Sequence, residues 1–553
     1  MPEQHGDPLE AEESGIEPVP EPEGETEIIE TDYEVGQDNW SKSYVLQFDV
    51  HNPVFGVAAG LIVAITLLTL FFQVQSEPFF TGLRDRMTAH LGWFFLLAGN
   101  IFVILCLGLI VSPLGRVRLG GTEASPDYGY VGWFSMLFAA GMGIGLMFYG
   151  VSEPLGHFNA ALGGVELGEG GVRTDWAPLG GAEGDAEAAR RLGMAATIYH
   201  WGLHPWAIYA VVALALALFS YNKGLPLTLR SAFYPIFGER IWGWPGHVID
   251  ILAILATVFG LATSLGIGAQ QAAAGLDFLF AVGTSNGVLI LLIIAITAVA
   301  VWSIARGLEG GVKLLSQVNM GLALALLAFI IIVGPTVAIA TGFLKNMLAY
   351  GANLPALAMP FGREDTNFVQ GWTAFYWAWW ISWSPFVGMF IARVSRGRTV
   401  REFLIAVLIV PTVLSILWMT ALGGTAISQV VQEGAGSLMD APLELKLFEM
   451  LRGLPLTAVT SLIGITLVIV FFITSSDSGS LVIDTIAAGG KINAPVIQRI
   501  FWASLEGIVA IALLLGGGLV ALQAMAVSTG LPFTLVLLAA CYSVVRGLLN
   551  EPR

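Results

Sequence analysis

The chain has 553 residues, of which 56% are hydrophobic and only 12% are charged. A soluble domain carries about 25% charged residues, so this composition excludes a soluble globular protein and indicates an integral membrane protein. The two cysteines, Cys106 and Cys541, both lie in apolar stretches, which argues against a disulfide framework or a cysteine metal site. Residues 1–40 are polar and acidic, so no signal peptide is expected there.

The net charge of −16 is concentrated at the N-terminal end. Residues 1–40 contain 14 acidic residues and no lysine or arginine, whereas the rest of the chain holds 27 acidic against 25 basic residues, a net charge of −2. A segment rich in Glu, Pro and Gly has little apolar surface to bury, so residues 1–45 are predicted to form a disordered, acidic cytoplasmic tail. The alternative is a regulatory segment that contacts basic cytoplasmic loops.

Twelve apolar segments follow, each long enough to cross a membrane, which takes about 20 residues. Lysine and arginine favour the loops that would lie on the same side as both termini, which predicts cytoplasmic termini. A short amphipathic helix on the surface is expected after Asp440. The predicted spans are residues 53–73, 91–112, 130–153, 195–220, 247–282, 287–305, 314–343, 368–392, 402–426, 455–477, 497–516 and 520–545.

Helix-breaking residues interrupt two of these spans, five spans apart. The third span carries Gly141, Gly143 and Gly145, and the eighth runs into Ser384-Pro385. Spans 3–7 and 8–12 then form two blocks of five, and an odd number of spans gives the blocks opposite orientations. A pair of interrupted helices at matching positions of two halves points to the binding site of a transporter. For either break alone, close helix packing is the alternative.

Aromatic residues gather in two of the predicted spans. Residues 372–383 hold five of the 16 tryptophans, and helical spacing divides the rings of this stretch between two adjacent faces. The fourth span adds Trp201, Trp206 and Tyr209. Grouped ring faces attract a cation that has no hydrogen to donate. An aromatic belt at the membrane interface is the alternative for the fourth span, and plain packing is the alternative for any single ring.

Hydroxyl groups are concentrated around an acid in the tenth span, where Thr474, Ser475, Ser476 and Ser478 surround Asp477. Hydroxyl oxygens fit a small, hard cation. An ionisable residue within the membrane is a functional candidate. The alternatives are that the hydroxyls bond back to helix carbonyls, and that Asp477 caps the helix or pairs with a basic loop residue.

Taken together, these motifs resemble those of the betaine/choline/carnitine transporters, secondary carriers of quaternary ammonium compounds and related zwitterions. The resemblance covers residues 45–548 and is carried by residues 141–145, 201–206 and 377–393. It implies an all-α membrane protein with 12 transmembrane helices, in which a LeuT-like core of two inverted five-helix repeats follows two N-terminal helices. The implied segments are residues 46–120 for the two N-terminal helices, 121–345 and 346–548 for the repeats, and 549–553 for a short C-terminal tail.

The resemblance also implies a homotrimer in the plasma (inner) membrane, with an aromatic cage for the substrate and a sodium site beside it. Trp377 and Trp379 are expected only to pack. The implied substrate-binding residues are Trp201, Trp206, Tyr209 and Trp380, with Trp383 on the cytoplasmic path and Met142, Gly143 and Gly145 at the helix break. The implied sodium ligands are the carbonyls of Ala139, Met142 and Phe471 and the hydroxyls of Thr474 and Ser475.

A second sodium site in this family would use Thr257 and Phe386. Leu261 stands where that site needs another threonine, so the sodium stoichiometry is left open. Osmotically activated members carry a long basic C-terminal helix, and the few residues after the last predicted span do not support osmosensing through such an element.

The sequence therefore predicts sodium-driven import of glycine betaine, with sodium as the coupling ion and no cofactor or nucleic-acid partner. Family members that do not use sodium have an arginine or an acidic residue near the glycine break, and this chain has neither there. Choline, carnitine or ectoine as the solute remain open, as does a non-transporting osmosensor or channel. An intramembrane enzyme would need paired acids, a metal cluster or an activated nucleophile in the spans, and none is evident beyond Asp477.

Overall fold

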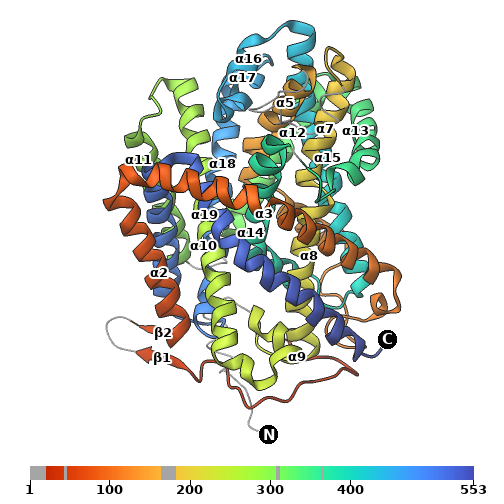
Figure 1. The fold of residues 1–553 in the computed structure, drawn as a ribbon, viewed down its shortest axis with the longest axis vertical. Helices are drawn as coiled ribbons and strands as arrows, with labels where there is room; N and C mark the ends of the chain where they lie inside the picture. The colour runs from red at the N-terminus through yellow and green to blue at the C-terminus, as the bar shows by residue number, and fades with distance from the viewer. Residues whose placement is uncertain (1–19, 43–46, 164–181, 307–311, 364) are drawn as a thin grey trace.

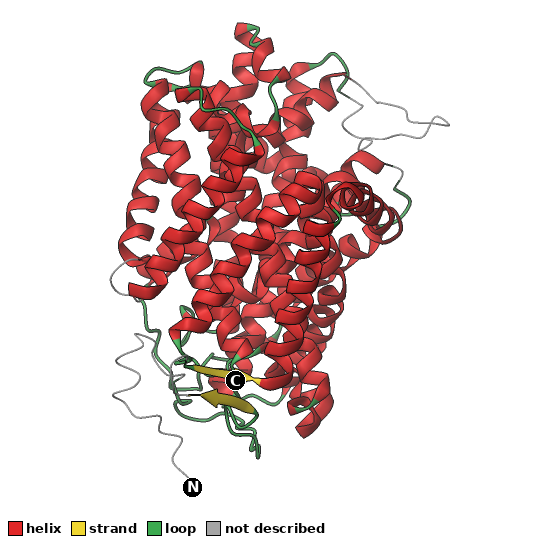
Figure 2. Cartoon of the chain, turned by 90° about the vertical axis from the view of Figure 1, so that its left-hand side faces the viewer, coloured by secondary structure: helices red, strands yellow, loops and turns green. Residues whose placement is uncertain are grey.

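The computed structural model describes residues 20–42, 47–163, 182–306, 312–363 and 365–553. Within these ranges the chain forms a bundle of helices, most of which run along the long axis of the molecule (Figures 1 and 2). Two short strands, β1 (Asn39–Lys42) and β2 (Phe48–His51), pair antiparallel at the lower end of the bundle. The expected helical protein is therefore confirmed, with one hairpin before the first predicted span.

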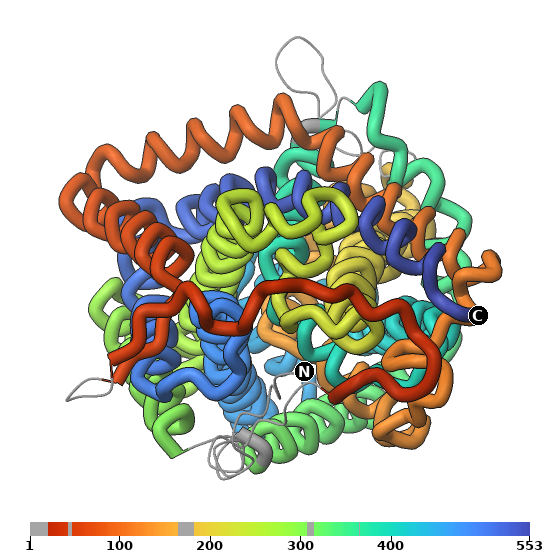
Figure 3. The backbone as a smooth tube through the Cα atoms, turned by 90° about the horizontal axis from the view of Figure 1, so that it is seen from below, coloured from red at the N-terminus to blue at the C-terminus, as the bar shows by residue number. Residues whose placement is uncertain are grey.

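Two long helices lie at the outside of the bundle. α2 (Asn52–Phe71) matches the first predicted span, and Pro53 lies in its first turn, where the missing N–H costs no helical hydrogen bond. α3 (Gln73–Val111) begins well before the second predicted span. It crosses the outside of the molecule obliquely, beside the second half of α19 (Val496–Leu549) (Figures 1 and 3).

The third predicted span is broken at its glycine-rich stretch. α4 (Tyr130–Gly141) and α5 (Ile144–Gly163) are separated by two residues, and the chain bends by 63° between them. Met142, in the break, has an extended backbone with φ −88° and ψ 128°. Because glycine loses more conformational freedom in a helix than other residues, the neighbouring glycines weaken the helix at this point. The predicted break in this span is confirmed.

The remaining elements complete the bundle and its loops. The first half continues with α7 (Ala186–Trp201), α8 (Leu203–Ala217), α10 (Trp244–Phe280), α11 (Asn286–Arg306), α12 (Val312–Val333) and α13 (Thr336–Leu357). The second half comprises α14 (Ala374–Arg393), α15 (Val400–Glu433), α16 (Gly436–Asp440), α17 (Lys446–Arg452), α18 (Thr457–Ala487) and α19. Short helical turns are η1 (Pro113–Arg116), η3 (Leu218–Asn222), η4 (Leu229–Phe233), α9 (Tyr234–Phe237), η5 (Gly238–Trp242), η6 (Thr366–Thr373) and η7 (Leu443–Leu445).

Helices lie within all twelve predicted spans, although the seventh, 314–343, runs past the end of α12 into α13. Length and apolarity alone do not count twelve. Among the described residues, nine helices are long and apolar enough to cross a membrane, or ten if α4 and α5 form one span. α14 is not among them, because its tryptophan and tyrosine residues lower its hydropathy. α19 counts once although it contains two predicted spans, with non-helical backbone at Gly517 and Gly518. The number twelve therefore stays a prediction.

The second predicted helix break is wrong. α14 continues through Pro385 without interruption. Proline has no N–H to offer the carbonyl four residues earlier, which here belongs to Ile381. The Ser384 hydroxyl donates to that carbonyl at 2.7 Å, so the proline leaves no unsatisfied acceptor. The two halves of the chain therefore differ at the positions where both were expected to open.

Glycines bring α14 close to its neighbours. A Cβ on Gly530 of α19 would lie 2.9 Å from the carbonyl oxygen of Ala378, and a Cβ on Gly388 would lie 2.6 Å from a methyl group of Val212 on α8. Lipid chains are as apolar as leucine, so membrane helices associate through close packing of this kind rather than through a hydrophobic driving force. The tryptophan-rich helix is thus held in the interior by backbone contact.

The acidic N-terminal segment differs from the expected disordered tail over the residues that the structure describes. Residues 20–42 follow a defined path across the lower end of the bundle (Figure 3), while residues 1–19 and 43–46 lie outside the described ranges. Glu23 pairs with Arg396 after α14, and a carboxylate oxygen of Glu27 lies 2.5 Å from Lys223 Nζ. Tyr33 stacks on Trp242 with a ring separation of 4.3 Å. These contacts match the alternative reading, in which the segment binds basic loops.

The two ends of the described chain meet at the lower end of the bundle. The Thr26 hydroxyl donates to a carboxylate oxygen of Glu551 at 2.9 Å, and the second oxygen of Glu551 lies 2.6 Å from Lys223 Nζ. A chain whose two ends lie on one side of a membrane crosses it an even number of times. This placement agrees with the even number of predicted spans.

Replacing Gly530 by valine tests the packing of α14. The added side chain would collide with backbone atoms of α14, and overpacking of this kind costs about 1–3 kcal/mol. We expect a lower melting temperature in detergent. Gly60→Val is the matched control, because a Cβ on Gly60 of α2 meets nothing within 4 Å. Equal melting temperatures for the two variants would contradict the tight crossing.

Replacing Arg396 by glutamine tests the placement of the acidic segment, because it removes the charge that pairs with Glu23 and Asp127. We expect faster deuterium uptake at the backbone amides of residues 20–38. Lys345→Gln, which breaks an exposed ion pair with Glu187 on another part of the molecule, serves as the control. Uptake that is the same in wild type and Arg396→Gln would show that the ion pair does not hold the segment.

Candidate functional site

A cavity of ≈ 60 Å³ lies at the break between α4 and α5. The other walls come from the end of α7 and from α8, α10, α14 and α18, so five further helices converge on the exposed backbone of the break. The lining residues are Ala140, Gly141, Met142, Gly143, Ile144, Gly145, Leu146, Trp201, Tyr209, Ser264, Trp379, Trp380, Trp383, Val387 and Ser475.

Trp380 is the centre of an aromatic cage beside this cavity. Its ring centroid lies 5.4 Å from that of Trp201, 6.1 Å from that of Trp206 and 5.2 Å from that of Tyr209. The rings of Trp201 and Tyr209 meet it edge to face, so their faces turn in different directions around the space between them. The structure therefore brings together the four rings that the sequence predicted as a cage, although Trp206 does not line the cavity itself.

The glycines of the break make room for these rings. A Cβ on Gly145 would lie 2.6 Å from the ring of Trp201 and 2.8 Å from that of Trp379, and no real Cβ approaches another atom so closely. Around Gly143, by contrast, a Cβ would meet nothing within 4 Å. Gly145 is thus required for ring packing, whereas Gly143 leaves open space. Trp379, which the sequence assigned to packing, lines the cavity and donates its indole N–H to Ser264 at 3.2 Å.

Two of the cavity rings carry buried polar groups that are not used within the protein. In the part of the chain that the structure describes, the indole N–H groups of Trp380 and Trp383 are buried and have no hydrogen-bond partner. The start of α5, at Ile144, also belongs to the cavity wall. A helix N-terminus presents free N–H groups and a positive partial charge, which favour an anion. The cavity thus combines ring faces for a cation with donors for a carboxylate.

The predicted sodium ligands come from the break and from α18. Met142 and Ser475 line the cavity. The carbonyl of Ala139, in the last turn of α4, accepts the N–H of Met142 at 3.3 Å. The Thr474 hydroxyl donates to the carbonyls of Val470 at 3.0 Å and Phe471 at 3.1 Å, which is the back-bonding that the sequence left as an alternative. These bonds use the hydroxyl hydrogen and leave lone pairs on each oxygen.

The residues of the second predicted sodium site do not line the cavity. The Thr257 hydroxyl is buried in α10 and donates to the carbonyl of Ala253 at 2.7 Å. Phe386 packs against Trp383 with a ring separation of 5.6 Å. Leu261 is buried against Gly479 of α18. An aliphatic side chain therefore occupies the place at which a second hydroxyl would be needed.

Comparison with known proteins identifies the family. The sequence model of the betaine/carnitine/choline family transporters (BCCT) matches residues 53–553. The chain belongs to this family. It is 64% identical over 536 residues to a glycine betaine/proline/choline transporter of Vibrio parahaemolyticus, with 97% of each chain covered. It is 53% identical to glycine betaine transporter 1 of the same bacterium, over 95% of this chain and 98% of that protein. A glycine betaine transporter of Acinetobacter baylyi is 39% identical, over 90% of this chain and 73% of the other.

This BCCT protein is thus a multi-pass membrane transporter and not an enzyme, as the sequence predicted. The resemblance read from the glycine break and the tryptophan-rich span is confirmed by a match over nearly the whole chain. The family is shown by this match, whereas the solute and the coupling ion are matters for proposal.

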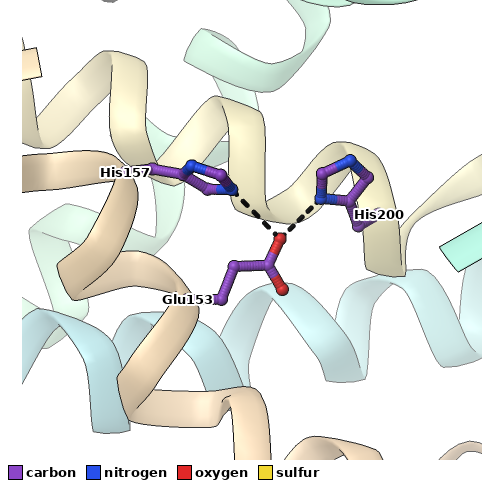
Figure 4. Close-up of side chains that lie close together, drawn as sticks. All are labelled: Glu153, His157 and His200. Atoms are coloured by element: carbon purple, nitrogen blue, oxygen red, sulfur yellow. Dashed lines mark hydrogen bonds and ion pairs between the residues drawn. The ribbon is translucent and has the colours of Figure 1, made fainter. Parts of the chain in front are cut away.

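Sequence reasoning about this BCCT transporter missed a buried carboxylate directly behind the cage. Glu153 of α5 is fully buried, and its Oε2 accepts hydrogen bonds from Trp201 Nε1 and Tyr376 Oη, both at 2.7 Å. Its Oε1 lies 2.5 Å from His200 Nδ1 and 3.3 Å from His157 Nε2 (Figure 4). One acid is therefore shared by a cage tryptophan, a tyrosine of α14 and two histidines.

The predicted end of the third span explains why this residue was missed. The predicted third span ends at residue 153, and sequence reasoning assigned no role to Glu153. α5 instead continues to Gly163 and places Glu153 in the middle of a helix. The spacing of Glu153 and His157, one helical turn apart, is the signal that could have indicated an inward-facing pair. Asp477, the acid that the sequence singled out, accepts the Ser303 hydroxyl at 2.9 Å and does not line the cavity.

Proposed function

We propose that this transporter imports glycine betaine together with sodium. The observation that carries the proposal is the cage of Trp201, Trp206, Tyr209 and Trp380, three of whose rings line the cavity. A trimethylammonium group has no N–H to donate, and ring faces attract it through their quadrupole with about 0.5–2 kcal/mol per contact. Trp201, Trp206 and Tyr209 are buried, which keeps water from these three rings and strengthens the attraction.

The other end of a betaine molecule carries a carboxylate. The unpartnered indole N–H groups of Trp380 and Trp383 and the N-terminal end of α5 are donors within the same cavity wall. A cavity that combines donors with ring faces suits a zwitterion better than a simple cation. The names of three relatives that cover most of this chain include glycine betaine, which supports the same solute.

Choline and proline are the second candidates, because the relative with 64% identity is named for all three solutes. Choline has the trimethylammonium group but a hydroxyl in place of the carboxylate, so it offers the two indole donors one neutral and weaker acceptor. Proline has the carboxylate but a smaller ammonium group that carries hydrogens. Carnitine and ectoine remain possible solutes of the same fold. Competition for uptake among glycine betaine, choline, proline, carnitine and ectoine ranks the contributions of the ring faces and of the donors to binding.

Sodium coupling is supported by the proximity of an open backbone and a hydroxyl. Met142 at the break and Ser475 on α18 line one cavity with the aromatic cage. A cation bound between α4, α5 and α18 would stabilise the arrangement of the break that also binds the solute. Because coupling between two ligands is reciprocal, the solute would then raise the affinity for sodium by the same factor.

The proposed architecture is the LeuT-like pair of inverted repeats with twelve spans. Its support lies in two contacts: α5 packs against α15, and α14 packs against α8. α5 and α14 belong to the third and eighth spans, and α8 and α15 to the fourth and ninth. Exchanging each span with its counterpart in the other block of five converts the first pair into the second, as an internal two-fold relation requires. Lys223 and Arg396 lie at the end where both termini meet, which supports cytoplasmic termini. We retain the homotrimer as part of this proposal.

Replacing Trp380 by leucine removes the ring that the other three share. We expect the betaine concentration for half-maximal uptake in proteoliposomes to rise about tenfold, the equivalent of roughly 1.4 kcal/mol. Trp302→Leu is the control, since that tryptophan is 52% exposed on α11 and contacts Arg306. If Trp380→Leu and wild type reach half-maximal uptake at the same betaine concentration, the cage is not part of the substrate site.

Replacing Ser475 by alanine tests the sodium site. We expect a higher sodium concentration for half-maximal betaine uptake, because one oxygen ligand is lost. Ser480→Ala on the same helix is the control, since its hydroxyl donates to the Asp477 carbonyl within α18. If both variants keep the wild-type sodium dependence, Ser475 is not a ligand.

A channel or non-transporting sensor would use the same cage without coupling. Proteoliposomes with an inward sodium gradient distinguish these classes. A sodium-coupled carrier accumulates labelled betaine above the outside concentration, and the accumulation disappears when the gradient is removed. A channel only equilibrates the solute, and a sensor moves none.

A further inference from the structure

We propose that Glu153 is a positioning residue that sets the orientation of the cage and thereby the affinity for the solute. The inference deepens the proposed function and depends on it only for the identity of the ligand. Glu153 lies on α5, Trp201 and His200 lie at the end of α7, and Tyr376 lies on α14. A single side chain thus connects three helices that meet at the substrate cavity.

The hydrogen bonds of Glu153 control two rings at once. Its Oε2 accepts from both the indole N–H of Trp201 and the hydroxyl of Tyr376, at 2.7 Å each. Those two rings are 5.5 Å apart and edge to face. Trp201 in turn stands edge to face with Trp380 at 5.4 Å. A displacement of the carboxylate would therefore move Trp201 relative to Trp380, the central ring of the cage.

The other oxygen of Glu153 is held by the two histidines (Figure 4). His200 uses both ring nitrogens, Nδ1 toward Glu153 Oε1 at 2.5 Å and Nε2 toward the Thr373 hydroxyl oxygen at 2.9 Å. The Thr373 hydroxyl donates to the Phe368 carbonyl at 3.3 Å, so it accepts from His200 Nε2–H. With Nε2 protonated, a hydrogen on Nδ1 makes the ring an imidazolium. That positive charge would compensate the buried carboxylate, which a membrane interior otherwise disfavours.

The same three residues could suggest a metal site, since their ligand atoms lie within 4.8 Å of one another. The distances favour a proton instead. Ligands of a tetrahedral zinc ion, each about 2.0–2.1 Å from the metal, stand roughly 3.3 Å apart. Glu153 Oε1 and His200 Nδ1 are separated by only 2.5 Å, which is too close for two ligands of one zinc ion and close enough for a direct hydrogen bond. Charge-assisted N–H···O bonds are about 2.7–2.9 Å long. In addition, Trp201 and Tyr376 already occupy the second carboxylate oxygen.

Glu153→Gln is the informative variant, because it keeps the shape of the side chain and removes the charge. A carboxamide offers one oxygen and one NH2 group, so it cannot accept from Trp201, Tyr376 and His200 together. We expect the dissociation constant for glycine betaine, measured by tryptophan fluorescence at saturating sodium, to rise about tenfold. Tyr376→Phe removes one of the donors and should give a smaller rise. The double variant should bind no worse than Glu153→Gln, because the two residues act through one contact.

Asp484→Asn is the matched control. Asp484 is a buried carboxylate of α18 that accepts a hydrogen bond from Gln498 at 2.8 Å and does not line the cavity. We expect wild-type betaine affinity in this variant. If both variants weaken binding in proportion to a loss of melting temperature, the effect of Glu153 is general destabilisation and the proposal is overturned.

A readout without ligand separates this inference from the proposed function. The ultraviolet resonance Raman signal of the indole N–H reports its hydrogen bonding, and the difference between wild type and Trp201→Phe isolates residue 201. We expect that difference to change when it is measured in the Glu153→Gln background. An unchanged difference spectrum would overturn the positioning role. If wild-type protein binds no betaine, while Glu153→Gln still changes the difference spectrum, the proposed solute is wrong and the positioning role stands.

Discussion

The close approach of aromatic rings to a glycine-rich stretch of backbone governs the site. Gly145 lies so close to the rings of Trp201 and Trp379 that a Cβ cannot be accommodated. The same glycine-rich stretch weakens the helix, so that α4 and α5 separate at Met142. One local sequence feature therefore provides the space for the cage, the free backbone groups and the start of α5.

Buried charges connect this site to the surrounding helices. Both carboxylate oxygens of Glu153 have hydrogen-bond partners, and Arg230 pairs with Asp250 in the same bundle. A charge at membrane depth is costly unless it is paired, so each such pair holds its helices in one arrangement. At the lower end, ion pairs from Lys223 and Arg396 attach the acidic N-terminal segment to loops between spans. Polar contacts thus stabilise specific helix neighbours in addition to the close packing at glycines.

Several expectations failed because they depended on partners remote in sequence. Pro385 looked like a helix break, but Ser384 supplies the donor that the proline lacks, and glycine contacts from α8 and α19 hold α14 in place. Residues 20–42 have the composition of a disordered tail, yet basic side chains from distant loops bind them. Glu153 ends the predicted third span and was assigned no role, because its four partners lie on α5, α7 and α14.

The sequence by itself determined that this is a membrane protein, where its helices lie, that one span breaks at Met142, and which four rings lie together. These features are local: apolar length, glycine content and helical spacing are written in consecutive residues. Only the tertiary structure decided which rings line the cavity, that the eighth span stays unbroken, and that Glu153 supports Trp201. These depend on contacts between helices that are far apart in the sequence, and composition does not encode which faces will meet.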